Sequence, residues 1–211
     1  MRKARTARTK LLSFTAAMLA GLGIVLASPA QAQFSDGYKF LEAVKKKEGQ
    51  KVEDALSEPG TTVIRSRDVT SGETALHVVT QRRDLTWLRF LVAKGADVNQ
   101  RDFKGTSPLQ LATRLGWVEG VDFLIGKNAN ADDPDDAGET PLISAVHRRD
   151  TELMRILLKG GADPDRADNS GRSARDYAKL GSNSGQLLAT IDEHASDKNR
   201  NKAQATYGPT L

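Results

Sequence analysis

The sequence of 211 residues contains no cysteine, only three histidines and 5% aromatic residues. Without cysteine there is neither a disulfide framework nor a lipid-modified cysteine anchor, so the fold must be stabilised by packing alone. Catalytic patterns that depend on cysteine are excluded, and the chain has no G-x-S-x-G turn and no HExxH-like pair of histidines. The sequence therefore favours neither a nucleophilic enzyme nor a zinc site.

The first 32 residues are predicted to be a signal peptide that is cleaved after Ala32. Basic residues without any acid precede the apolar run LLSFTAAMLAGLGIVLA, and the small-residue site Ala30-Gln31-Ala32 follows it. These three features are typical of a secretory leader. The apolar run is close to the minimum length of a membrane span, so an uncleaved anchor is the alternative. We expect a cleaved protein, located in a bacterial periplasm and not associated with a membrane.

Removal of this leader changes the charge of the chain. The full sequence has 31 Lys and Arg against 27 Asp and Glu, and five of the basic residues lie in the leader, so 26 remain against 27 and the net charge changes from +4 to about −1. The positive net charge of the full sequence therefore comes from the predicted leader, and we expect the mature protein not to bind nucleic acid. The mature chain of about 179 residues is long enough for one modest domain.

A period of 33 residues runs through the mature chain. It relates four glycines and, two positions after each, four hydroxyl residues: Gly72, Gly105, Gly138 and Gly171, with Thr74, Ser107, Thr140 and Ser173. Glycine favours a turn that requires a positive φ, and a hydroxyl side chain favours a helix N-cap. Each unit is thus predicted to contain a turn, a short helix and a second helix that ends at Gly95, Asn128 or Gly161.

These units resemble the ankyrin repeat, whose motif runs D-x-x-G-x-T-P-L-H-x-A and ends L-L-x-x-G-A-D-x-N. The matching segments are GETALHVV with FLVAKGADVN, DFKGTSPLQLA with FLIGKNANAD, and DDAGETPLISA with ILLKGGADPD. The resemblance implies an all-α ankyrin-repeat solenoid of stacked helix pairs with β-turn fingers, in which about three good repeats lie between degenerate capping repeats. The expected parts of the domain at 33–195 are an N-terminal cap at 33–67, repeats at 68–100, 101–134 and 135–167, and a C-terminal cap at 168–195. A disordered tail is expected at 196–211.

Two candidates for chemistry have structural interpretations. His77 stands at the histidine place of the motif, where the resemblance implies a hydrogen bond between neighbouring turns, and its counterparts Gln110, Ile143 and Asp176 share no chemistry with it. The acid cluster ADDPDDAGE does not fit a calcium loop, because Ser144 stands where a bidentate acid is required. We expect no metal, no cofactor and no enzymatic activity.

The variable positions of the repeats are the candidate binding residues. In the family geometry, the turn tips and the first helices form a concave surface that meets another protein. Its candidate contacts are Glu73, Arg82, Phe103, Lys104, Arg114, Trp117, Glu139, His147 and Arg148. The arginines suggest a stripe, and arginine is enriched at interface hot spots, although an ordinary solvated face is the alternative. Trp117 has a second interpretation, as a cover over the core.

The sequence thus predicts a non-enzymatic protein-protein interaction module that is monomeric on its own and has another protein as its partner. One alternative is a dedicated protector or inhibitor of a single periplasmic enzyme, and a more distant one is a metal-binding or hydrolytic protein. Replacement of Arg82, Arg114 and Arg148 by alanine is expected to weaken partner capture without changing the helical circular dichroism.

Overall fold

The computed structural model describes residues 35–180 and 184–194 of the chain. These residues belong to one unit that spans 34–211. The predicted signal peptide, with its cleavage site at Ala32, and the predicted tail at 196–211 lie outside the described residues. In the part of the chain that is described, no helix is both long and apolar enough to cross a membrane.

The described helices occur as short antiparallel pairs. The first pair is α1 (Asp36–Lys45) with α2 (Gly49–Ser57), followed by the 3-10 turn η1 (Val63–Arg65). The next pairs are α3 (Ala75–Gln81) with α4 (Leu85–Ala93), α5 (Pro108–Arg114) with α6 (Val118–Ile125), and α7 (Pro141–His147) with α8 (Thr151–Lys159). Helix α9 (Ala174–Leu180) precedes the helical residues 184–194. Between 35 and 194, outside the gap at 181–183, no strand occurs, which confirms the all-α prediction.

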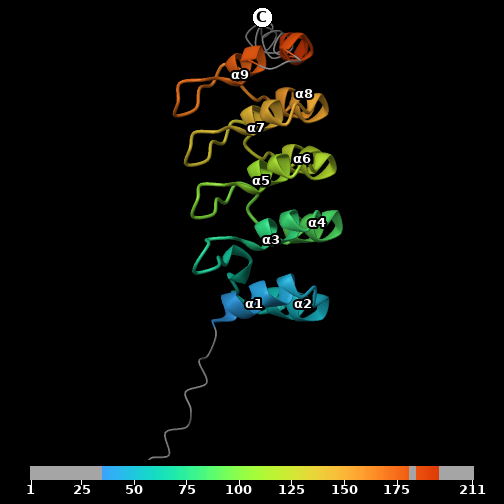
Figure 1. Cartoon of the computed structure of the whole chain (residues 1–211). Helices are drawn as coiled ribbons and strands as arrows, with labels where there is room; N and C mark the ends of the chain where they lie inside the picture. The colour runs from blue at the N-terminus through green and yellow to red at the C-terminus, as the bar shows by residue number, and fades with distance from the viewer. Residues whose placement is uncertain (1–34, 181–183, 195–211) are drawn as a thin grey trace, which may run out of the picture. The chain divides into compact units, whose positions relative to one another are not determined.

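The pairs stack in chain order, with first helices on first helices and second helices on second helices (Figure 1). Helix α3 packs on α1, α5 on α3, α7 on α5 and α9 on α7. Small residues at the same position of each first helix, such as Ala112, Ala145 and Ala178, are fully buried and let neighbouring helices approach closely. A single pair could not bury its apolar face, so the stack is the unit that folds.

Each first helix begins at the hydroxyl residue that the sequence indicates. The side chains of Ser107 and Thr140 accept the backbone N–H three residues further on, and Thr74 forms a reciprocal capping box with His77. Helices α5 and α7 have proline at their first position, where the missing N–H has no helical partner in any case. The turns before α3, α5, α7 and α9 project from the first-helix side of the stack as fingers (Figure 1).

The second helices end in the left-handed backbone region, as predicted. The φ angles are +91° at Gly95, +61° at Asn128 and +97° at Gly161. Asparagine can replace glycine here because these two residues tolerate this conformation best. Two arginines adopt the same conformation in the break between helices, with φ of +53° at Arg83 and +55° at Arg149. The short breaks therefore carry a local strain that the flanking helices must hold in place.

The last repeat replaces an apolar contact by ion pairs. Arg175 stands where the other repeats have leucine, which predicts loose packing or a trimmed outer side. Its guanidinium forms an ion pair of 2.8 Å with Asp165 and another with Asp192 in the helical residues 184–194. Charged groups thus join α9 to the loop before it and to the last described helix, where an apolar side chain would otherwise be needed.

Candidate interaction face

Each finger is closed by an aspartate that accepts hydrogen bonds from the finger's own backbone. Asp102 Oδ1 accepts the N–H groups of Lys104, at 2.9 Å, and Thr106, at 2.8 Å. Asp135 holds Ala137 and Glu139 in the same way, at 2.9 Å each. These bonds fix the loop conformation before any partner arrives, so the tips are presented by a preorganised backbone.

Neighbouring fingers are joined to each other by a repeated backbone hydrogen bond. In each case the residue at the tip of one finger donates its N–H to a carbonyl oxygen of the finger before: Phe103 to Ser71 at 2.9 Å, Asp136 to Lys104 at 3.3 Å, and Asn169 to Ala137 at 3.2 Å. Glycine is required beside this bond for two reasons, since Gly72 has a φ of +74° and a Cβ there would lie only 2.7 Å from the Phe103 nitrogen.

His77 forms a second link between fingers. Its Nδ1 accepts the backbone N–H of Thr74 at 3.1 Å, so Nε2 carries the proton and donates it to the carbonyl oxygen of Thr106 at 2.9 Å. Burial lowers the pKa of His77 below its ordinary value, which keeps the ring neutral. In the next repeat Gln110 makes the corresponding link, from Nε2 to the carbonyl oxygen of Glu139 at 3.1 Å. The two side chains share a geometry, and nothing in it calls for acid-base chemistry.

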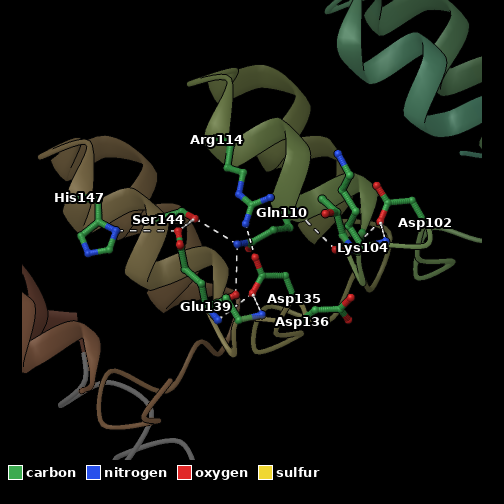
Figure 2. A network of polar contacts seen from close by, with 12 residues as sticks. Asp102, Lys104, Gln110, Arg114, Asp135, Asp136, Glu139, Ser144 and His147 are labelled. Atoms are coloured by element: carbon green, nitrogen blue, oxygen red, sulfur yellow. Dashed lines mark hydrogen bonds and ion pairs between the residues drawn. The ribbon is translucent and has the colours of Figure 1, made fainter. Parts of the chain in front are cut away.

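A polar network lies between the third finger and α7 (Figure 2). Gln110 Nε2 donates to Ser144 Oγ at 3.0 Å, Ser144 donates in turn to Glu139 Oε1, and His147 Nδ1 lies 3.9 Å from the same carboxylate oxygen. A serine nucleophile needs a histidine between the serine and the acid. Here the acid lies between the other two, and Ser144 is only 3% exposed. The arrangement suits a polar binding surface and does not activate the serine.

All three arginines proposed as a stripe form hydrogen bonds or ion pairs with other parts of the chain. Arg82 donates from Nη1 to the carbonyl oxygens of Val44, at 2.6 Å, and Lys45, at 3.2 Å. These carbonyls lie at the end of α1, where a cation also complements the helix dipole. Arg82 is half-buried as a result. A partner that meets Arg82 must compete with these internal contacts.

The other two arginines also connect repeats, although both are exposed. Arg148 donates from Nη1 to the carbonyl oxygen of Arg114 at 3.1 Å, and Arg114 forms an ion pair with Asp135 of the next finger (Figure 2). Their guanidinium groups remain accessible to a partner at the rim of the face. The triple alanine variant is therefore expected to lower stability as well as any binding, which makes it a poor test of the face.

Trp117 requires a correction, because its side chain is only 5% exposed and belongs to the core. The ring lies over Gly120, where a Cβ would collide with it. The glycine three residues after the tryptophan was the available signal, since it leaves room for the ring on the face of α6. Trp117 is thus the cover over the core, and it is removed from the candidate contacts.

The fingers of the first two repeats expose apolar side chains. Phe103 is 57% exposed, with its ring against Gly72, and the neighbouring Lys104 is also exposed. Val69, which the sequence did not indicate, is 88% exposed. The signal for it is one additional residue between aspartate and glycine in the first finger, where Asp68 precedes Gly72 by four positions instead of three. Glu73 is half-exposed at the base of this finger.

The acid cluster of the third repeat is used in structural contacts. Asp133 accepts from Arg101 Nε at 3.0 Å, Asp132 accepts the backbone N–H of Asp163 at 2.6 Å, and Asp135 pairs with Arg114. These three carboxylates therefore already have partners within the stack. Within the described ranges, no group of three or more histidine, aspartate or glutamate side chains is placed to hold a metal ion.

Stacked helix pairs and linked fingers define an all-α repeat protein. Two family models match the chain, one for ankyrin repeats in three copies at residues 40–135 and one for ankyrin repeats in many copies at residues 125–178. Together they cover about two-thirds of the sequence, and the chain belongs to the ankyrin-repeat family. No curated protein matches it. Ankyrin repeats are typically protein-protein interaction modules and generally non-catalytic, so the family suggests a protein partner.

Proposed function

We propose that this protein acts after export, in a bacterial periplasm, as a non-enzymatic module that binds another protein through the fingers and first helices. The observation that carries the proposal is Phe103, which is 57% exposed although its backbone is fixed by the bond to Ser71 and its ring rests on Gly72. An exposed aromatic side chain that is already ordered loses little entropy when a partner covers it. Aromatic side chains, including Phe, are enriched at protein-protein interfaces relative to the rest of the surface.

The location rests on the leader, and the protein's own N-terminus tests it. The full-length gene, expressed in its native cells with a C-terminal affinity tag, should give a periplasmic protein whose first residue is Gln33. Recovery of the chain in the membrane fraction with Met1 retained would support the anchor instead. This measurement does not depend on any partner.

Affinity capture tests the binding role. The tagged full-length protein should capture a partner from periplasmic extract, and Phe103→Ala should reduce the captured amount by tenfold or more, which is the effect of about 1.4 kcal/mol. Lys159→Ala, at an exposed position at the end of the second helix α8, is the control and should capture normally. Equal melting temperatures would show that both variants are folded. A single stoichiometric enzyme in the captured material would favour a protector or inhibitor of that enzyme.

A further inference from the structure

One position of each first helix faces the fingers. Ser144 on α7 contacts Glu139 of the finger before α7. The hydroxyl of Tyr177 on α9 likewise donates to Asp168 Oδ2 of the finger before α9, at 2.7 Å. The 33-residue register places Val78 and Leu111 at the same position of α3 and α5, and both are half-buried. The floor between fingers and first helices is therefore apolar in the first two repeats and polar in the next two.

The finger tips show the same division. The first two fingers present Val69 and Phe103, whereas the third and fourth present Asp136 and Asn169. Because the tips are joined by backbone hydrogen bonds, the apolar pair and the polar pair form two neighbouring halves of one surface. We call the four apolar residues the apolar half of the face: Val69, Val78, Phe103 and Leu111.

The charge beside the apolar half of the face differs between finger tip and finger base. Lys104 follows Phe103 at the tip, is exposed, and forms no ion pair within residues 35–180 and 184–194. Glu73 lies at the base of the first finger and is half-exposed. A partner carboxylate is therefore favoured next to Lys104 and disfavoured next to Glu73.

We propose that the apolar half of the face binds a bulky apolar side chain from an extended segment of the partner protein, and that Lys104 binds a carboxylate next to that side chain. This inference rests on the proposed function, because it specifies the chemistry of the same face. It makes the first two repeats the main source of affinity. The third and fourth repeats add polar contacts whose side chains are already paired with one another, such as Glu139 with Ser144.

A phage-displayed library of random dodecapeptides, selected on the immobilised full-length protein, tests this chemistry without the natural partner. Enriched peptides should carry a large apolar residue adjacent to Asp or Glu. Selection on Lys104→Glu should replace the acid by Lys or Arg at the same place, and Phe103→Ala should lower enrichment by tenfold or more. Lys159→Glu makes the same charge change on α8 and should leave the enriched motif unchanged.

The inference is overturned if enriched peptides lack an apolar-acid pair, if Lys104→Glu leaves their charge unchanged, or if no peptide is enriched over a blank surface. Should Phe103→Ala fail to fold, Val69→Ser at the fully projecting tip replaces it with the same expected loss. Periplasmic capture separates the two proposals. If a partner is captured but Lys104→Glu and Phe103→Ala bind it normally, the role proposed for the apolar half of the face is wrong while the binding function stands.

Discussion

Asp136 lies so close to Gly105 that a Cβ on the glycine would come within 2.9 Å of the Asp136 backbone nitrogen. Gly105 also has a φ of +70°, so it meets two separate requirements, a left-handed turn and a close approach of the next finger. The equivalent Gly171, in the last described finger, has a φ of +79° but no atom within 4 Å of such a Cβ.

This contrast predicts different costs for the same substitution. Gly171→Ala should lower the free energy of unfolding by about 1 to 2 kcal/mol, the cost of the left-handed conformation alone. Gly105→Ala should cost at least about 1 kcal/mol more, because the third finger must also move. Urea unfolding of the two variants measures the difference. Equal losses would show that the contact between fingers contributes nothing to stability.

His77 predicts a dependence of stability on pH. Its pKa is lowered in the folded state by burial, whereas in the unfolded chain it is about 6.5. The unfolded state therefore binds the proton more readily, and stability that is complete above about pH 6.5 is lost as the pH falls below that value, by at most about 1.4 kcal/mol per pH unit. Protonated Nδ1 can no longer accept the Thr74 N–H.

The substitution His77→Gln isolates this effect. Glutamine already links two fingers at position 110, so the variant can keep the inter-finger bond without a titrating ring. Melting temperatures between pH 7.5 and 5.5 should fall less for His77→Gln than for the unaltered protein. The same fall in both proteins would mean that another group accounts for the acid sensitivity.

Arg82 is predicted to stabilise the first helix pair. Arg82→Ala removes two hydrogen bonds from a cation to the end of α1 and should cost about 1 to 3 kcal/mol. Hydrogen exchange should speed up first in α1 and α2, because each repeat is stabilised by its neighbour. Arg148→Ala, which removes one exposed bond to Arg114, is the comparison and should have the smaller effect. A loss of partner binding with unchanged exchange would assign Arg82 to the interface instead.

The repeat core is predicted to tolerate cavities poorly. Leu124 on α6 has no exposed surface, and Leu124→Ala should lower the free energy of unfolding by about 2 to 5 kcal/mol. Leu180, at the end of α9, is 70% exposed, and its replacement by alanine should change stability by less than about 0.5 kcal/mol. Denaturant titration compares them, and similar values for the two positions would contradict the placement of the core.

The sequence predicted the backbone of this fold well because the relevant signals are local. A glycine such as Gly72 indicates a turn with a positive φ, and a hydroxyl residue such as Thr74 caps the helix that follows it. Because both signals repeat every 33 residues, they suffice to place the turns and helices. The leucines kept in the same register report burial against neighbouring repeats. The family matches at 40–135 and 125–178 do not mark single repeats, so the predicted repeat boundaries remain predictions.

The candidate site was less predictable because side-chain partners come from other repeats. Arg82 and Arg148 are 66 residues apart, which is two repeats, whereas Arg114 is one position out of this register. Arg82 and Arg148 donate hydrogen bonds to the preceding repeat, whereas Arg114 forms an ion pair with the next finger. Whether an arginine is free for a partner depends on the carbonyls that the preceding helix presents. Trp117 is a further case, since its burial follows from the packing of its ring over Gly120, which the sequence signals only by a glycine three residues further on.

Photo-crosslinking tests the central claim most directly. Benzoylphenylalanine would replace Phe103 at the finger tip and, in a separate variant, Phe123 on the second-helix side, in the full-length protein expressed in its native cells. Irradiation should join a partner protein to position 103 and give no product of that size from position 123. A product from position 123 with none from position 103 would place the interaction on the opposite side of the stack and contradict the proposed face.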